Sequence, residues 1–474
     1  MDPNQTLPRR TFRFRSTEKR STLLLGDVFI AVFSLLSALY MWAQGPEWYK
    51  FSWAFLQERV PLWFYLMPVL WLILLSETYS TRRSTMRRET MQALTMATAV
   101  FAGIYLVVFF VSDPSSLPRR AVAIFIGVVF ILTLIWRLIY IQLFTAPLFL
   151  RRMVIVGAGR AGSSLAKVIH ELWPPPFYVV GMVDDDPKKV GQEIEGFPVL
   201  GTSNDLFDLV NEHQVTDLVF AITGEMNQQT FKRLLEAEER GIEVTSMANL
   251  YEELLGRVPI SLLQSDWVLR SFIDQSHMGG FFEIGKRLID IIGSLVGLII
   301  LAVASIFIAP LIVLDSGFPV FYRQVRLGRN GKPYNMIKFR TMKNDAEKDG
   351  IARPAEENDN RATRIGHILR KTHLDELPQF YNIFRGEMSL VGPRSERPEI
   401  VEELQSAIPF YRARLFVKPG LTGWAQVNYG YASGVEANAM KLEYDLYYIK
   451  HRTIGLDLLI MFRTVWTVIG FRGR

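Results

Sequence analysis

Long apolar runs separated by short polar segments fill the first third of the chain. Four of them cover about residues 21–43, 60–78, 91–112 and 121–143. Each approaches the roughly 20 residues that span the hydrocarbon core of a bilayer. No small-residue cleavage site follows the first run, so a removable signal peptide is not expected. The pattern predicts a four-helix transmembrane domain over residues 1–147.

Basic residues at the ends of these runs indicate their orientation. The arm RRTFRFRSTEKR, the loop TRRSTMRR and the pair at 151–152 are basic, whereas the connection at 44–59 is nearly balanced. The positive-inside rule therefore predicts that both ends of this domain are cytoplasmic, although Arg119 and Arg120 lie on the predicted outer side. Asp27 and Arg137 lie near helix ends, and we expect their side chains to snorkel rather than to serve transport.

After Arg151, short strand-like runs such as MVIV alternate with helical patterns. This alternation predicts a Rossmann-like α/β domain, a doubly wound parallel sheet, over residues 148–262. Gly157, Gly159 and Gly162 form G-x-G-x-x-G between a strand and a helix, the context of dinucleotide or nucleotide-sugar binding. We expect instead a scaffold of this type that serves regulation or assembly, and cofactor binding by these glycines is the alternative.

An NAD-dependent epimerase or dehydratase of the short-chain type would need a Tyr-x-x-x-Lys pair soon after this domain. Tyr334 and Lys338 match the spacing, but they lie in a strand-like pattern beyond another apolar run. We interpret the match as chance. A membrane-anchored nucleotide-sugar epimerase or dehydratase is therefore the alternative function.

A fifth apolar run covers residues 284–315, after a predicted linker at 263–283. Lys286 and Arg287 lie at its start, and Arg323 and further basic residues follow its end. Basic residues on both sides are expected if both ends face the cytoplasm. Pro310 would bend the helix by removing a backbone hydrogen bond. We predict a re-entrant membrane helix; the alternative is a fifth span that puts the C-terminal domain outside.

Composition agrees with a membrane protein. Hydrophobic residues make up 49% of the chain and the mean hydropathy is positive. The absence of cysteine excludes disulfides and thiolate metal sites, and the six scattered histidines give no zinc-binding pair. A net charge of +6 suits nucleic acid or an anionic membrane surface. The apolar runs favour the membrane, so no nucleic acid partner is expected.

The polar region 316–474 contains the pair Asp375 and Glu376 in HLDELPQ. Pro378 is best tolerated in the first turn of a helix, which predicts a helix that begins near Asp375. Five cations lie just before the pair or in neighbouring motifs: Lys338, Arg340, Arg370, Lys371 and Arg394. Two carboxylates among cations suit a diphosphate bound with Mg²⁺, and one carboxylate could attack phosphorus. The alternative is a helix cap beside a solvated basic face. The charged stretch 343–363 is predicted to be a loop.

The motifs KRLID, KFRTM, LDELPQ, GEMSLVGPR and KPGLTGWAQVN follow in this order around the fifth apolar run. This series resembles the bacterial sugar transferase family of monotopic phosphoglycosyl transferases. The four preceding spans and the Rossmann-like domain resemble its long subgroup, the exopolysaccharide polyprenyl glycosylphosphotransferases. The resemblance is specific over 284–474 and architectural before that.

The resemblance implies transfer of a sugar 1-phosphate from a UDP-sugar, with glucose or galactose expected, to undecaprenyl phosphate. Mg²⁺ would be the cofactor, and UMP would leave as an exopolysaccharide, capsule or O-antigen begins. Asp375 would be the nucleophile that forms a covalent phosphosugar intermediate. Glu376 would help to hold Mg²⁺ or accept a proton.

Further roles follow from the same resemblance. Substrate binding is expected of Lys338, Arg340, Arg370, Arg394 and Gln426, and structural roles are expected of Pro310 and Asp290. The catalytic domain, residues 316–474, would be mainly α and would lie on the cytoplasmic face of a bacterial inner membrane. We also expect a homodimer through the middle domain. Serine follows Arg394 where many members have proline.

Overall fold

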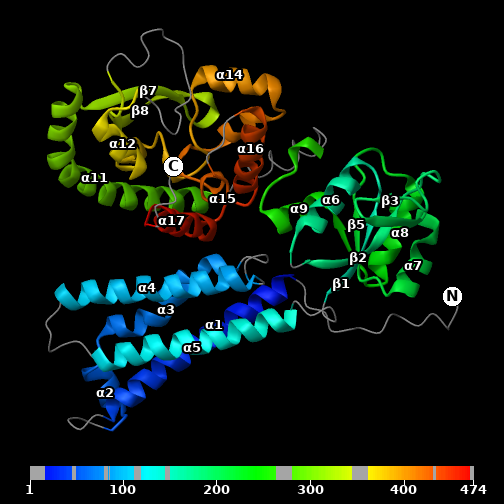
Figure 1. Ribbon diagram of the computed structural model, residues 1–474, viewed down its shortest axis with the longest axis horizontal. Coiled ribbons are helices and arrows are strands. Elements are labelled where there is room, and N and C mark those ends of the chain that lie inside the picture. Colours follow the sequence, from blue (N-terminus) through cyan, green and yellow to red (C-terminus); the bar gives the residue numbers. More distant parts are fainter. Residues whose placement is uncertain are drawn as a thin grey trace. The chain divides into compact units, whose positions relative to one another are not determined.

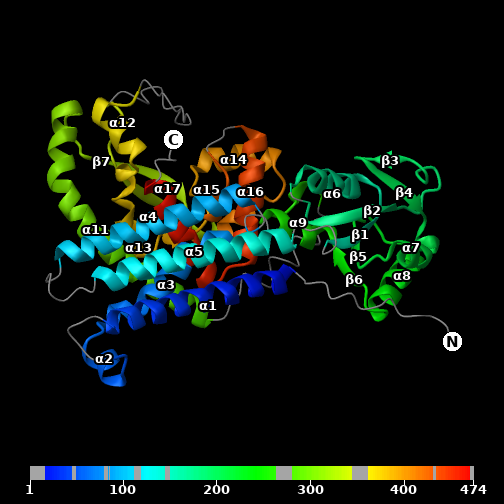
Figure 2. The same cartoon turned by 60° about the horizontal axis from the view of Figure 1, so that its bottom comes forward.

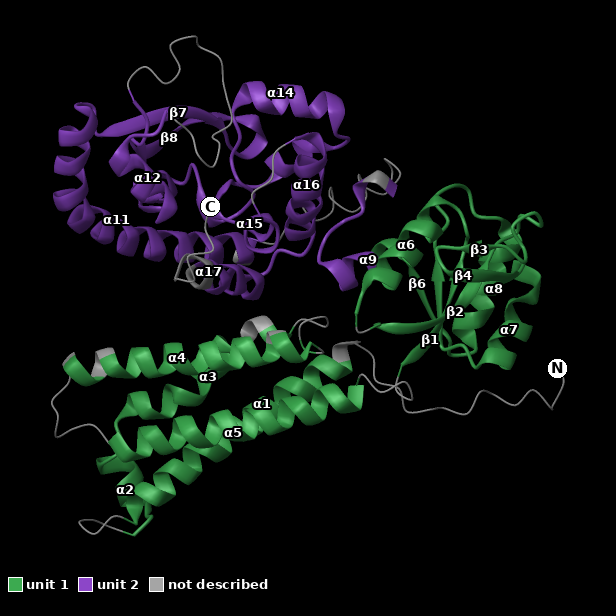
Figure 3. Ribbon diagram, viewed as in Figure 1, with its two compact units in different colours: residues 1–250 green, residues 251–474 purple. Residues whose placement is uncertain are grey.

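The computed structural model describes most of the chain, in two compact units. The described residues are 16–44, 50–79, 84, 86–111, 119–144, 150–173, 175–262, 280–343, 361–430 and 434–469. Residues 1–250 form one unit and residues 251–474 the other (Figure 3). The elements of both units are labelled in Figure 1.

The apolar runs of the N-terminal region form helices. The main ones are α1 (Ser16–Ala43), α3 (Met67–Leu74), α4 (Arg87–Val111) and α5 (Arg119–Phe144), with a short α2 (Trp53–Glu58) between the first two. Their core includes Phe64, Trp71, Phe101 and Phe125. In the described part, α1 and α5 are long and apolar enough to cross a membrane. The second and third runs give only the shorter apolar segments Leu62–Leu74 and Thr90–Leu106.

A buried ion pair joins α1 to α5. Arg137 donates to Asp27 at 2.6 Å, and the Tyr79 hydroxyl donates to the same carboxylate at 2.8 Å. Asp27 is 0% exposed and Arg137 is 1% exposed. The expectation that these side chains snorkel is therefore wrong. Hydropathy rules are applied to one helix at a time, so they cannot identify an ion-pair partner that lies on another helix.

Replacing Arg137 by leucine should strongly destabilise this helical region. Asp27 would remain as a buried charge without its ion-pair partner, which typically costs about 3–5 kcal/mol. The measurement is thermal unfolding of the full-length protein in detergent, with the exposed Arg120→Leu as the control. The double change Asp27→Leu with Arg137→Leu should recover much of the loss, because an apolar pair can replace a buried ion pair. An equal loss of thermal stability in the single and the double variant would contradict this account.

The α/β region forms a sheet, mostly parallel, with the strand order β3-β4-β2-β1-β5-β6. The strands are β1 (Arg151–Val156), β2 (Phe177–Val183), β3 (Glu193–Ile194), β4 (Phe197–Gly201), β5 (Asp217–Phe220) and β6 (Glu243–Ser246). The helices are α6 (Arg160–Glu171), α7 (Leu206–His213) and α8 (Gln228–Glu239). Only β3 pairs antiparallel, at one edge. Figure 2 shows α6 on one side of the sheet and α7 and α8 on the other, which confirms the predicted α/β domain with a parallel sheet.

The C-terminal unit is mainly helical. After α9 (Met247–Leu255) it contains α11 (Gly280–Ser316), the hairpin β7 (Phe321–Leu327) and β8 (Pro333–Phe339), α12 (Arg364–Lys371), α13 (Gln379–Arg385), β9 (Ser389–Val391), α14 (Pro398–Ala407), β10 (Gly420–Thr422), α15 (Trp424–Asn428), α16 (Val435–Lys450) and α17 (Ile454–Ile469). Of the predicted linker, 263–279 lie outside the described residues, as do 344–360 of the predicted charged loop.

The segment 251–262, which the sequence pattern assigned to the sheet domain, contacts the C-terminal unit. The Trp424 indole donates to the Gly256 carbonyl at 2.7 Å, and the Val258 amide donates to the Glu443 carbonyl at 3.1 Å. Val258 is also part of the hydrophobic core that α16 forms there. This short segment therefore extends the C-terminal unit at its start.

Both ends of α11 pack on the same unit. Near its start, Lys286 binds Asp457 of α17 at 2.6 Å. Near its end, the Asp315 carboxylate accepts from the Ile365 amide of α12 at 2.9 Å. Pro310 lies inside the helix, and Figure 1 shows that α11 bends. A bent path explains how one helix contacts two separated parts of a compact unit.

Candidate active site

A tight turn holds the two adjacent carboxylates. His373 adopts a left-handed conformation with φ of 58°, and residues Leu374–Glu376 then form one 3₁₀ turn. The following α-helix begins at Gln379, after Pro378. Proline has no N–H to donate and its ring would clash with the carbonyl four residues earlier, so the α-helix cannot run through it from Asp375. The predicted helix start near Asp375 is therefore wrong by one turn.

Lys338 of β8 lies between the carboxylates. Its Nζ atom is 2.6 Å from Glu376 Oε1 and 4.0 Å from Asp375 Oδ2. Asp375 is 7% exposed, so its surroundings contain little water. Two neighbouring carboxylates in such a place repel each other strongly, and a shared cation reduces that repulsion. Lys338 thus reduces the repulsion between the two acids of this turn.

Arg394 is the second cation on Glu376, with Nη2 3.0 Å from Oε1. Burial alone would raise the pKa of Glu376, but Lys338 and then Arg394 hold that pKa well below its usual range. In return, Glu376 raises the pKa of Arg394. The Arg394 side chain is 39% exposed, so it can contact a ligand while it holds Glu376.

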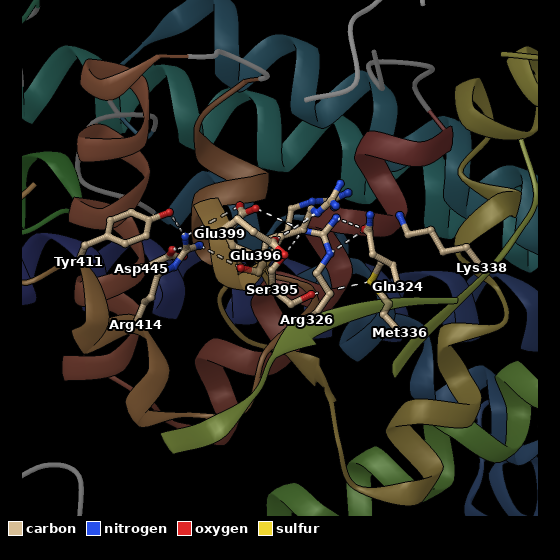
Figure 4. A network of polar contacts seen from close by, with 12 residues as sticks. Gln324, Arg326, Met336, Lys338, Ser395, Glu396, Glu399, Tyr411, Arg414 and Asp445 are labelled. Carbon is tan, nitrogen blue, oxygen red and sulfur yellow. Dashed lines mark hydrogen bonds and ion pairs between the residues drawn. The ribbon is translucent and has the colours of Figure 1, made fainter. Parts of the chain in front are cut away.

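A buried polar network fixes the loop that contains Arg394. Figure 4 shows this network around Arg326, Ser395 and Arg414. On one side, Arg414 donates to the Arg394 carbonyl at 3.0 Å and binds Asp445 at 2.9 Å. On the other side, Arg326 of β7 donates to the Ser395 carbonyl at 3.1 Å. The isolated arginines of the sequence gave no sign of this network, because its members are brought together only by the fold.

The start of α11 positions the elements on both sides of the carboxylates. Asp290 accepts from the Ser389 hydroxyl and from the Leu390 amide, each at 2.9 Å, and so anchors β9, which leads to Arg394. Arg287 donates to the Ile383 carbonyl at 2.8 Å, at the end of α13. The KRLID segment of α11 therefore supports both the carboxylate turn and the arginine loop.

Two glycines let α11 approach these elements closely. A Cβ atom at Gly293 would lie 2.5 Å from Leu390, and one at Gly297 would lie 2.3 Å from the ring of Phe380. Both distances are shorter than van der Waals contact. Phe380 is the second residue of α13, close to the carboxylate turn. The glycines therefore set how near that turn lies to α11.

Gly297→Val should destabilise the C-terminal unit by about 1–3 kcal/mol, the usual cost of overpacking. The valine side chain would push Phe380 and the start of α13 away from α11. Ala302→Val adds similar volume on an exposed position of the same helix and is the matched control. Thermal unfolding of the full-length protein should show a lower midpoint for Gly297→Val alone; a normal midpoint would refute close packing at this glycine.

The other three residues expected to bind substrate are Arg340, Arg370 and Gln426, and each has different surroundings. Arg340 donates to the Ser316 carbonyl at 2.8 Å and to the Gly317 carbonyl, so it holds the turn that leaves α11. Arg370 lies in the last turn of α12, and its guanidinium has no hydrogen bond or ion pair among the described residues. Gln426 donates to the Leu421 carbonyl at 3.2 Å, while its buried Oε1 has no partner within the described part. Their role in binding stays a prediction.

The backbone of the glycine loop in the sheet domain requires glycine at two of the three motif positions. Gly157 has φ of +108°, and a Cβ atom at Gly162 would lie 1.9 Å from the Gly157 carbonyl oxygen. A Cβ atom at Gly159 would meet nothing within 4 Å. The amide of Ala158, in the middle of the loop, donates to the Asp184 carboxylate at 2.7 Å. This amide, which could otherwise donate to a phosphate, therefore donates to a carboxylate of the protein itself. Cofactor binding by these glycines stays a prediction.

Comparison with known proteins gives two family matches. Residues 281–471 match the bacterial sugar transferase family, and residues 74–248 match a CoA-binding domain family. The first of these ranges contains all of α11 except Gly280, and also both carboxylates, Lys338 and Arg394.

Three curated relatives are similar in sequence to this chain, each over a different share of its length. The UDP-N-acetylgalactosamine-undecaprenyl-phosphate N-acetylgalactosaminephosphotransferase of Aeromonas hydrophila is 38% identical over 234 residues, 49% of this chain and 54% of that protein. The UDP-glucose:undecaprenyl-phosphate glucose-1-phosphate transferase of Xanthomonas campestris pv. campestris is 32% identical over 68% of this chain and 67% of that protein. The exopolysaccharide production protein PSS of Rhizobium leguminosarum bv. phaseoli is 41% identical over 38% of this chain and 92% of that protein.

The matched region thus spans about half the length of the Aeromonas relative, two thirds of the Xanthomonas relative and nearly all of the Rhizobium relative. The carboxylate turn, its two cations and the KRLID segment of α11 that supports them all lie within the family match. This chain belongs to the bacterial sugar transferase family.

Proposed function

We propose that this protein transfers a sugar 1-phosphate from a UDP-sugar to undecaprenyl phosphate and releases UMP. The observation that supports this most is the convergence of Lys338 and Arg394 on Glu376, next to the buried Asp375. The names of the Aeromonas and Xanthomonas relatives describe the same reaction type with different sugars. We propose glucose or galactose as the sugar here, and the product would begin an exopolysaccharide, capsule or O-antigen.

In the first step, a carboxylate oxygen of Asp375 attacks the β-phosphorus of the UDP-sugar. A bond forms between that oxygen and phosphorus, and the bond from phosphorus to the bridging oxygen breaks. UMP leaves with the bridging oxygen and its electron pair, and the sugar phosphate stays on Asp375 as an acyl phosphate ester. Arg394, which is partly exposed beside Glu376, is placed to bind phosphate oxygens.

In the second step, a phosphate oxygen of undecaprenyl phosphate attacks the same phosphorus. The bond from phosphorus to the Asp375 oxygen breaks, which restores the carboxylate and gives the polyprenyl-diphosphate sugar. Arg370, with no partner among the described residues and five positions before Asp375, is a candidate to bind the acceptor phosphate. Arg394 would then contact the donor phosphate and Arg370 the acceptor phosphate.

The donor set suits Mg²⁺ when substrate phosphates complete it. The described residues contain no group of three or more His, Cys, Asp or Glu side chains that could hold a metal alone. Mg²⁺ sites commonly use one or two carboxylates together with substrate phosphates and water, and Asp375 and Glu376 supply such a pair. When bound, Mg²⁺ would neutralise charge on the diphosphate. Because the pKa of Glu376 is held low, a metal-ligand role fits this residue better than that of proton acceptor.

We further propose that residues 1–147 form a four-helix membrane domain and that α11 enters the membrane and returns. A straight helix of 37 residues would be about 55 Å long and would put its ends on opposite sides of a bilayer. Both ends of α11 instead contact one compact unit, through Asp457 and Ile365. Much of α11 also exposes apolar side chains, including Ile299, Val303 and Phe307. A cysteine in place of Asn330 should react only with reagents that reach the cytoplasm, whereas periplasmic labelling would refute this topology.

The sheet domain is proposed to serve regulation or assembly, including a homodimer, rather than redox chemistry. The epimerase or dehydratase alternative would use Tyr334 and Lys338. Burial raises the pKa of Tyr334 to about 12, whereas that chemistry needs a tyrosine that ionises readily. Lys338 is bound to Glu376. This pair therefore does not support the alternative.

The function can be tested with purified full-length protein, a panel of radiolabelled UDP-sugars and undecaprenyl phosphate. The proposal predicts labelled lipid and an equal amount of UMP with one preferred sugar. Conversion of the UDP-sugar to another nucleotide sugar, with no labelled lipid and no UMP, would instead support the epimerase or dehydratase. A parallel incubation without undecaprenyl phosphate is the control for hydrolysis.

A further inference from the structure

A cavity of about 550 Å³ lies against the hairpin β7–β8, apart from the carboxylates. Side chains alternate between the two faces of a strand. Lys338, which binds Glu376, therefore projects from the face of β8 opposite to that of Asn335 and Ile337, and both of these line the cavity. Arg323 pairs directly with Ile337 across the hairpin and shares its face. Tyr334, at the start of β8, also lines the cavity although it shares the face of Lys338. The cavity therefore lies mainly, but not wholly, on the face of the hairpin opposite to the carboxylate site.

The cavity is strongly basic. Its lining includes five cationic residues and one carboxylate: Arg323, Arg329, Lys332, Arg385 and Lys418, with Glu387. Glu387 already accepts from Asn382 at 2.7 Å and pairs with Arg385 at 3.4 Å. Arg323, Lys332 and Lys418 have no ion pair within the part of the chain that the structure describes. Several unpaired cations around an open space favour an anion.

Apolar side chains lie around this basic site. Phe321 and Val325 flank Arg323 on its face of β7 and are 44% and 47% exposed. Tyr381, which lines the cavity, and Phe384 of α13 are 44% and 43% exposed. α13 itself is held by Arg287, at the start of the long apolar helix α11. Exposed apolar residues beside cations, next to a membrane helix, fit a ligand with both a phosphate and acyl chains.

We propose that this cavity binds the phosphate headgroup of an anionic phospholipid of the membrane. Arg323 and Lys332 would contact the phosphate, and the exposed aromatic residues of α13 and β7 would contact the first part of the acyl chains. The site would thereby hold one face of the hairpin at the membrane surface while the opposite face presents Lys338 to the carboxylates. This binding does not depend on the transfer reaction. A soluble phosphate compound such as UDP shares the headgroup chemistry, but it would leave the apolar residues without a partner.

Binding can be measured by native mass spectrometry of the full-length protein in nonionic detergent. Dihexanoyl phosphatidylglycerol is the probe, and dihexanoyl phosphatidylcholine is the comparison lipid. We expect phosphatidylglycerol to bind more tightly than phosphatidylcholine. The double change Arg323→Gln with Lys332→Gln should weaken the binding of phosphatidylglycerol roughly tenfold or more, because each basic residue near an anionic lipid contributes to the binding free energy. UDP and inorganic phosphate at the same concentrations should displace little of the lipid.

Two variants make the result decisive. Lys188→Gln with Lys232→Gln removes the same charge from exposed positions of the sheet domain and should leave lipid affinity unchanged. Arg323→Lys with Lys332→Arg keeps the charge and should retain most of the affinity. Equal binding of both lipids, or equal losses in the charge-removing and charge-keeping cavity variants, would overturn the proposal. Full displacement by UDP or inorganic phosphate would assign the cavity to a soluble anion and would also overturn it.

Discussion

Asp375→Asn should abolish sugar-phosphate transfer, with a loss of at least about 10⁴-fold in rate. An asparagine amide is nearly the same size as the carboxylate but has no negatively charged oxygen with which to attack phosphorus. Lys338, Glu376 and Arg394 would stay in place, because their mutual contacts at 2.6 Å and 3.0 Å do not require Asp375. Donor binding should therefore change far less than the rate.

The measurement is the initial rate of labelled lipid formation, together with UDP-sugar binding by equilibrium dialysis. Glu402→Gln removes one carboxylate from an exposed position of α14 and should keep the normal rate. Retention of more than about one hundredth of the rate by Asp375→Asn would show that another group attacks phosphorus.

Lys338→Met should lower transfer about 10²- to 10³-fold at neutral pH and make the remaining activity depend on pH. In the native protein, Lys338 and Arg394 hold the pKa of Glu376 well below its usual range. Glu376 is therefore ionised throughout the range in which the enzyme can be assayed. Without Lys338, burial and the neighbouring Asp375 carboxylate both favour the protonated form, so the pKa of Glu376 must rise.

The sign of the pH effect follows from that rise. As pH falls, a carboxyl group with a raised pKa becomes protonated, and so loses its charge, at a higher pH than a carboxyl group with a low pKa. The variant should therefore lose activity as pH falls from about 8 to about 5, a range in which the native enzyme shows no such loss from Glu376. Lys338→Arg keeps a cation and should show a smaller shift. A variant profile that superimposes on the native profile would mean that Lys338 does not control the ionisation of Glu376.

The pattern of the chain predicts those features that depend on local periodicity. Apolar runs and alternating strand and helix patterns predicted the membrane-type helices and the parallel sheet. The motif order drew attention to Asp375, and the structure places Lys338 and Arg394 on its neighbour Glu376. Gly162 likewise has the close backbone neighbour that its motif implies. Such features are set by residues a few positions apart or by one short motif.

Other features depend on contacts between distant residues. The pair Asp27 and Arg137 joins positions that are 110 residues apart, and hydropathy along the chain describes each helix separately. Arg414 and Asp445 stabilise the Arg394 loop through contacts that no spacing rule identifies. The exact start of α13 depended on the 3₁₀ turn Leu374–Glu376, which precedes Pro378. Tertiary contacts decided each of these cases.

The central claim is that Asp375 forms a covalent bond to the sugar phosphate, and intact-protein mass spectrometry tests it directly. Full-length protein is mixed with Mg²⁺ and its preferred UDP-sugar, without undecaprenyl phosphate, and quenched in acid. The account predicts that the protein gains the mass of one sugar phosphate less water, that an equal amount of UMP appears, and that peptide mapping places the group on HLDELPQ. Asp375→Asn should gain no mass. Rapid transfer to lipid by a native enzyme that never gains this mass, or an unchanged gain in Asp375→Asn, would contradict the account.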